Sequence, residues 1–150
     1  MAHTYSSMLF HVVWSTLKRQ PLITEALKFR LHGYIRRVIE DREAKLVVIN
    51  GMPDHVHALI GIKPTMALAT LMRDIKTTSS KWVRLNFPEQ RDFSWQDGYG
   101  AFSVGLSALP IVKNYILNQE QHHSKKTFEN EFIDFLRAHQ MTYEERYVFD

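Results

Sequence analysis

Residues 44–62 read AKLVVINGMPDHVHALIGI, and this stretch decides the fold. Two short apolar runs, 44–50 and 55–62, flank Gly51-Met52-Pro53-Asp54, a combination of turn-forming residues. Apolar runs of this length on both sides of a turn are typical of two antiparallel strands joined as a hairpin. The stretch therefore predicts a central hairpin, and further elements are expected on both sides of it.

Toward the N-terminus the sequence predicts one strand and one helix. Residues 5–14 are rich in aromatic and β-branched side chains, which favours a first strand. Residues 25–42 carry apolar side chains at helical spacing, and Thr24 stands where it can cap that helix.

Toward the C-terminus the pattern predicts a helix over 65–86, a fourth strand within 93–104 and a helix over 108–122. Thr127 opens one more helix. The resulting order β-α-β-β-α-β is that of a ferredoxin-like fold of the α+β class. We expect an antiparallel sheet with helices on one face, followed by C-terminal helices, in a single domain over 1–150.

Composition narrows the classes of function. The chain has no cysteine, which excludes disulfides, thiolate zinc sites and cysteine nucleophiles and suits a cytoplasmic protein. No apolar run approaches the roughly 18–20 residues that a membrane span needs, so we expect no membrane contact. The net charge of +3 permits a nucleic-acid partner without requiring one.

His55 and His57 lie two residues apart on a predicted strand. Because strand side chains alternate, both imidazoles point to one face, and Val56 and Ala58 point to the other. Two imidazoles side by side offer half of a site for a divalent metal. An isolated pair of this kind is more often two ordinary strand histidines, so the pair alone leaves both interpretations open.

Tyr115 and Gln119 lie four residues apart on the predicted helix 108–122 and so share one face. Gln119 can offer a neutral carbonyl oxygen to a cation, with Tyr115 one turn away. Ile116 and its apolar neighbours lie on the same side, so simple packing of Tyr115 is the alternative. Taken with the histidines, Gln119 completes a set of neutral ligands. A bound Mg²⁺ or Mn²⁺ would keep its full charge and open positions for a phosphodiester.

Two polar groups near these residues are expected to play other roles. Asp54 precedes the histidine strand at a turn, and we assign it a structural role. His122 and His123 are adjacent on a predicted helix, so their side chains diverge by about 100°. We interpret them as polar residues of the helix end.

Basic side chains gather on one face of the predicted helix 65–86. They are Arg73, Lys76, Lys81 and Arg84, interleaved with the hydroxyls of Thr77, Thr78 and Ser80. Cations and hydroxyls together suit contacts with DNA phosphates, although any solvated helix face carries charge. Lys18 and Arg19 in the first loop are a second predicted DNA contact.

Together the motifs resemble those of the single-tyrosine HUH transposases of the insertion-sequence 200/605 family. His55-Val56-His57 matches the motif of two histidines around a hydrophobic residue, and Tyr115 with Gln119 matches the Tyr-x-x-x-Gln of the nucleophile helix. Further segments resemble the family in the expected order. These are residues 11–22, 52–57, 95–104 and 112–123.

The resemblance implies a catalytic mechanism. Tyr115 would attack single-stranded DNA at hairpin-containing element ends, leaving a 5′-phosphotyrosine and a free 3′-OH. A divalent metal would be bound by His55, His57 and Gln119, and no nucleotide cofactor is needed because the covalent bond conserves the phosphodiester's energy. The family further implies a homodimer in which one subunit's tyrosine helix can complete the partner's site. Two alternatives are a non-catalytic, domesticated module that binds single-stranded nucleic acid and a metal-dependent phosphodiesterase that uses water.

Overall fold

The computed structural model describes residues 3–123, 126–144 and 148. Its strands are β1 (Leu9–Ser15), β2 (Lys45–Met52), β3 (His55–Gly61) and β4 (Gly100–Val104). Its α-helices are α1 (Glu25–Asp41), α2 (Leu68–Asn86), α3 (Leu109–Leu117), α4 (Gln119–His123) and α5 (Phe128–Ala138). Short 3-10 turns lie at Leu17–Arg19, Pro88–Gln90 and Leu106–Ala108. Within the described residues, every helix is too short or too polar to cross a bilayer.

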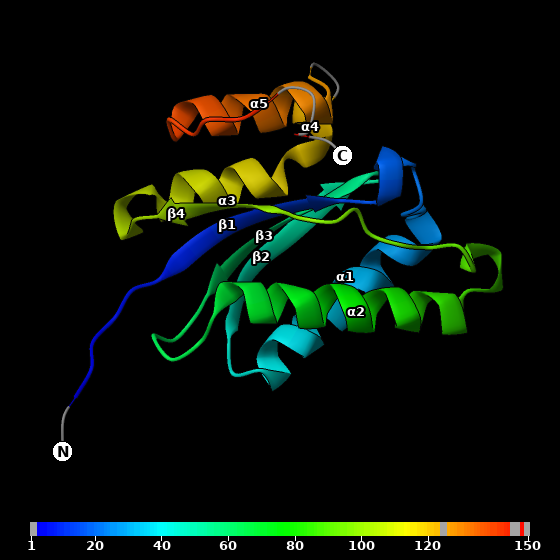
Figure 1. The fold of residues 1–150 in the computed structure, drawn as a ribbon, viewed down its shortest axis with the longest axis horizontal. Coiled ribbons are helices and arrows are strands. Elements are labelled where there is room, and N and C mark those ends of the chain that lie inside the picture. The colour runs from blue at the N-terminus through cyan, green and yellow to red at the C-terminus, as the bar shows by residue number, and fades with distance from the viewer. Residues whose placement is uncertain (1–2, 124–125, 145–147, 149–150) are drawn as a thin grey trace.

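The four strands form one antiparallel sheet in the order β2-β3-β1-β4. Helices α1 and α2 cover one face, and α3, α4 and α5 lie over the other (Figure 1). This arrangement confirms the predicted ferredoxin-like α+β fold with added C-terminal helices. The central pair, β1 and β3, runs in register from Leu9↔Gly61 to Ser15↔His55.

Strand β3 lies between two cores, so its alternating side chains are buried on both faces. Val56, Ala58 and Ile60 join the core beneath α1 and α2. Leu59 joins the smaller core beneath α3. His55 and His57 alternate with the first set, so they lie on the side of α3, α4 and α5, as their spacing predicts.

Gly51 allows the β2–β3 hairpin to close. A Cβ atom at this position would lie 2.2 Å from the carbonyl oxygen of His55, far inside any tolerated contact. The absence of a side chain at Gly51 therefore allows β2 to pair with the first residues of β3, where the histidines begin.

The predicted helix over 108–122 is wrong in one respect, because it is interrupted at Asn118. Asn50 on β2 donates its amide to the carbonyl oxygens of Ile116 and Leu117, at 3.0 and 3.1 Å, which ends α3. The chain then resumes as α4 at Gln119. The predicted caps at Thr24 and Thr127 are confirmed, since each side chain accepts a backbone N–H of its helix.

Candidate metal and nucleophile site

The structure brings the four residues of the two sequence motifs together within one chain. His55, His57 and Gln119 are fully buried between the sheet and the C-terminal helices, and Tyr115 is half-buried. Strand β3 supplies both histidines, α3 supplies Tyr115, and α4 supplies Gln119 at its first residue. Gln119 Oε1 lies 3.2 Å from His55 Nε2, which is the distance expected of groups that share a ligand or a proton.

Glu131 on α5 lies at the centre of this group. Its Oε1 atom lies 2.9 Å from His57 Nε2, 3.1 Å from His123 Nε2 and 3.6 Å from His55 Nε2. Its Oε2 atom accepts the hydroxyl of Tyr115 and, at 3.4 Å, the amide of Gln119. One carboxylate therefore connects the histidines to the tyrosine.

Glu131 was missed by the sequence analysis, although the sequence holds a signal for it. The apolar side of α5 carries Phe128 and Phe135, and Glu131 lies three residues after the first and four before the second. An acidic side chain inside the apolar stripe of a helix is rare unless it has a buried partner.

The two motif histidines are oriented by groups behind them. His55 Nδ1 lies 2.7 Å from Asp54 Oδ1, and a carboxylate can only accept, so His55 Nδ1 carries the proton. His55 Nε2 faces Gln119 Oε1 and Glu131 Oε1. His57 Nδ1 lies 2.7 Å from His11 Nε2. Asp54 thus has the structural role expected of it, and His11 is a further orienting residue that the sequence analysis missed.

Burial sets the charge of the site. It lowers the pKa of His57 to about 4, and it lowers the pKa of His11, with help from the neighbouring His57, to about 3. Both are therefore neutral at pH 7 and can use a ring nitrogen as a ligand. Burial opposes ionisation of Glu131, but hydrogen bonds from His123 and His57 outweigh it and hold the carboxyl pKa far below its usual range.

The hydroxyl of Tyr115 is held in its protonated form. Burial raises the pKa of the phenol well above its usual range, and the hydrogen bond to ionised Glu131 and its negative charge add to the effect. The ring of Tyr115 stacks on His122, with centroids 4.4 Å apart. The tyrosine is therefore positioned but not ionised in this arrangement.

The donor atoms suit a cation. His55, His57, His123 and Glu131 each offer one ligand atom, and these atoms lie within 4.8 Å of one another. Gln119 donates its amide N–H to Glu131 Oε2, so its oxygen is the atom that faces His55 Nε2. If the proton of His55 is on Nδ1, the lone pair of His55 Nε2 faces the lone pairs of Gln119 Oε1 and Glu131 Oε1. No proton then lies between these three atoms. A metal ion at this point would satisfy all three.

His123 lies at the end of α4, as interpreted, but it also belongs to the group of possible metal ligands. The side chains of His122 and His123 diverge, as predicted. Because the site lies at the end of α4, each of the two histidines still contacts a residue of the site. His123 points at Glu131, and its ring lies 4.5 Å from that of His55, while His122 flanks Tyr115.

Two cavities border the site. One, of about 300 Å³, is lined by Tyr115, His122 and Lys126. The other, of about 460 Å³, is lined on its polar side by Arg19, Asp54 and His123 together with the same Lys126. Residues of the site therefore line both cavities, and Lys126 lines both of them, while Asp54 and Glu129 add carboxylates to the second.

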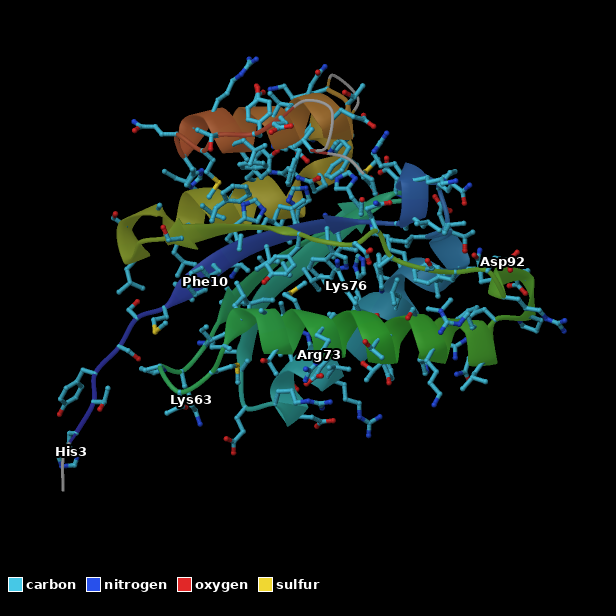
Figure 2. The ribbon with its side chains drawn as sticks, in the orientation of Figure 1. His3, Phe10, Lys63, Arg73, Lys76 and Asp92 are labelled. Carbon is cyan, nitrogen blue, oxygen red and sulfur yellow. The ribbon has the colours of Figure 1, made fainter. Side chains whose placement is uncertain are left out.

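Arg73 and Lys76 of the predicted basic face lie on the α2 side of the sheet (Figure 2), and α3, which carries Tyr115, lies on the other side (Figure 1). Lys76 donates to the carbonyl oxygens of Gln96, at 2.8 Å, and Gly98, and Arg84 donates to that of Phe93 at 2.9 Å. These two cations therefore hold the segment that leads into β4.

The other predicted DNA contacts differ in their surroundings. Arg73 pairs with Asp74, and Lys81 is exposed. Ser80 is buried and donates to the carbonyl oxygen of Lys76, so it does not belong to the exposed face. In the first loop Lys18 is exposed, and Arg19 pairs with Glu129 at the start of α5, close to the site.

Comparison with known proteins places this geometry in context. The family described as "Transposase IS200 like" matches residues 4–119. The chain is 20% identical over 122 residues to the ISDra2 transposase TnpA of Deinococcus radiodurans, which covers 78% of this chain and 85% of that protein. It is 25% identical over 125 residues to the transposase of insertion sequence IS200 of Salmonella typhimurium, covering 79% and 81%.

Two solved structures share the fold. A Deinococcus radiodurans R1 protein assigned as a transposase superposes with a TM-score of 0.64 at 22% identity, covering 79% of this chain and 95% of that one. A REP-associated tyrosine transposase bound to a REP hairpin superposes with a TM-score of 0.59 at 17% identity, covering 82% and 74%.

Proposed function

Because the chain belongs to the family of IS200-like transposases, we propose that it cleaves and rejoins single-stranded DNA with Tyr115 as the nucleophile. A divalent metal, bound by His55, His57 and Gln119, assists the reaction. The observation that carries this proposal is the contact between the Tyr115 hydroxyl and Glu131, whose other oxygen lies among the motif histidines. A tyrosine that only packed would not need its hydroxyl directed at that centre.

Each residue has a defined part in the proposed reaction. His55 and His57 would hold the ion through Nε2 once it replaces their contacts with Glu131, while Asp54 and His11 hold their rings in place. When bound, the ion supplies Lewis-acid polarisation of a phosphodiester oxygen. Tyr115 Oη forms the bond to phosphorus as its proton leaves, and the bond from phosphorus to the 3′ oxygen breaks to give a free 3′-OH. The reverse attack by a 3′-OH rejoins the strand.

The phenol must lose its proton for this attack, and Glu131 Oε2 is the atom that accepts the hydrogen bond of the Tyr115 hydroxyl in the structure. Burial raises the pKa of the phenol most, and the Glu131 carboxylate raises it further. Both effects oppose ionisation of Tyr115. A dication beside Glu131 would neutralise the effect of the carboxylate, because an opposite charge favours the phenolate. Metal binding is therefore expected to activate Tyr115 as well as the phosphodiester.

The proposed substrate is single-stranded DNA with a hairpin, since a protein of the same fold is bound to a hairpin. Lys126, which lines both cavities, and Arg19, which lines one, are proposed phosphate contacts, together with Lys18 next to Arg19 in the chain. The basic side chains of α2 would contact DNA that continues around the molecule. We further propose that this domain acts in the cytoplasm as a homodimer.

The decisive experiment uses end-labelled single-stranded DNA from the flanks of the protein's own gene, with Mn²⁺ or Mg²⁺. The wild type should yield a cleaved strand and a protein–DNA adduct that survives a denaturing gel. Tyr115→Phe removes only the hydroxyl, so DNA binding should persist while both products vanish. Cleavage without an adduct would identify water as the nucleophile, and binding without cleavage by the wild type would identify a non-catalytic module.

A further inference from the structure

We propose that His123 and Glu131 complete the ion site of this chain and make it select a transition-metal ion, such as Co²⁺ or Zn²⁺, over Mg²⁺. This inference rests on the proposed function, because it concerns the ion that would serve Tyr115. The inferred ligand set differs from the set of His55, His57 and Gln119. That smaller set has few donors and leaves room for the waters that Mg²⁺ retains.

The geometry gives the ion site three imidazoles and a carboxylate. Glu131 Oε1 lies within 3.6 Å of the Nε2 atoms of His55, His57 and His123, so all four donors surround a small volume. Glu131 is 3% exposed, which leaves little room for water around this oxygen.

Donor chemistry then decides the ion. Mg²⁺ requires near-ideal octahedral oxygen coordination and gives up its waters reluctantly. Imidazole nitrogen suits Zn²⁺, Co²⁺ and Ni²⁺, and affinity for such sites rises from Mn²⁺ through Co²⁺ to Cu²⁺. Sets of three histidines, or of two histidines with a glutamate, are typical of catalytic zinc. A buried set rich in nitrogen should therefore bind Co²⁺ or Zn²⁺ far better than Mg²⁺.

The two added donors come from a part of the chain beyond the family match, which ends at residue 119. The ring of His123 lies 4.5 Å from that of His55, and aromatic contacts flank Glu131. Phe128 stacks on His55, with ring centroids 4.5 Å apart, and Phe135 lies edge-on to Tyr115 at 5.6 Å. Because Glu131 lies on α5 between these two aromatic contacts, its carboxylate is directed at the histidines.

Glu131 also connects the ion to the nucleophile. Its Oε1 atom faces the ion site, and its Oε2 atom remains on the Tyr115 hydroxyl and the Gln119 amide. The residue that adds a ligand therefore also fixes the distance between the ion and the attacking oxygen, as a positioning residue for Tyr115.

The test measures metal binding by the full chain without DNA. Protein freed of metal by a chelator is titrated with Co²⁺ and with Mg²⁺ by calorimetry, and the visible spectrum of bound Co²⁺ reports its ligands. The wild type should bind Co²⁺ at least about a hundredfold more tightly than Mg²⁺. Glu131→Gln and His123→Ala should each weaken Co²⁺ binding at least about tenfold and change the spectrum. Circular dichroism establishes that each variant is folded, and His123→Asn replaces His123→Ala if the latter is not.

Glu129→Gln, on the same helix, and His3→Ala, on the exposed N-terminal segment, serve as matched controls that should bind Co²⁺ as the wild type does. Unchanged Co²⁺ binding in folded Glu131→Gln and His123 variants would overturn the inference, as would equal affinity for Mg²⁺ and Co²⁺. Neither result would touch the proposed function, whose test is the Tyr115 adduct formed with whichever ion supports it.

Discussion

The three histidines of the site are held by different partners. Asp54 hydrogen-bonds the ring of His55, and His11 hydrogen-bonds the ring of His57. The ring of His123 hydrogen-bonds Glu131. That the two motif histidines point to one face could be predicted, because side chains alternate along a strand. Their partners could not be predicted, because Glu131 lies 74 residues beyond His57 and meets it only through the fold.

We expect His57→Ala and Gln119→Ala to weaken binding of a divalent ion by about tenfold or more, because each removes a donor from a buried centre. Calorimetric titration measures the affinity. Excess Mn²⁺ should partly restore cleavage, since mass action offsets lost affinity. If both variants kept the wild-type affinity, the ion would have to bind elsewhere.

Buried His32 gives a prediction about pH that is independent of the ion site. Burial, with a smaller effect from Lys28, lowers its pKa from 6.5 to about 4, and its Nε2 has no hydrogen-bond partner within the described structure. Protonation therefore favours the unfolded chain, and this histidine costs stability as pH falls from 6.5 toward 4.

His32→Leu should reduce the loss of unfolding free energy between pH 7.5 and pH 5 by about 1–2 kcal/mol relative to the wild type. Urea unfolding at the two pH values measures this difference. His3→Leu, at an exposed position, should leave the pH dependence as it is. An identical loss in His32→Leu and wild type would mean that His32 does not carry the effect.

At the scale of elements, the hairpin and the two capped helices could be predicted because their signals are local. The interruption at Asn118 could not, because its cause is the Asn50 side chain on a distant strand. The role of Glu131 on α5 could not be predicted either. Its partners lie on α3, α4 and the sheet, which are brought together only by the fold. The basic face of α2 was predicted from periodicity, yet two of its cations hold the segment before β4.

Gly51→Ala tests the hairpin. The added Cβ would meet the His55 backbone at 2.2 Å, so we expect a loss of about 1–3 kcal/mol in unfolding free energy. We also expect weaker metal binding, because the added Cβ would displace His55, which is a proposed metal ligand. Gly33→Ala is the matched control, since nothing lies within 4 Å of its added Cβ at this exposed position of α1. It should be neutral or stabilising by up to about 1 kcal/mol. Equal effects of the two changes would contradict this view of the hairpin.

At the scale of the whole molecule, one chain contains a complete set of site residues. Tyr115 and Gln119 meet the histidines of their own chain through Glu131. The partner's tyrosine helix, which the family resemblance led us to expect in a shared site, is therefore not needed to build it. The homodimer itself stays a prediction.

Mixing the variants Tyr115→Phe and His57→Ala tests this arrangement. If each chain uses its own residues, every site in the mixture carries one defect and cleavage stays absent. Association of the two variants is verified by co-purification of differently tagged chains. Recovery of cleavage in the mixture would show that the tyrosine helix is exchanged between subunits.

The most direct test of the central claim is to locate the covalent bond. The adduct formed with single-stranded DNA is digested with nuclease and protease, and the peptides are sequenced by mass spectrometry. We predict a nucleotide attached through a 5′ phosphate to Tyr115, and to no other tyrosine of the chain. A nucleotide on a different residue, or cleaved DNA with no modified peptide, would contradict the assignment of Tyr115 as the nucleophile.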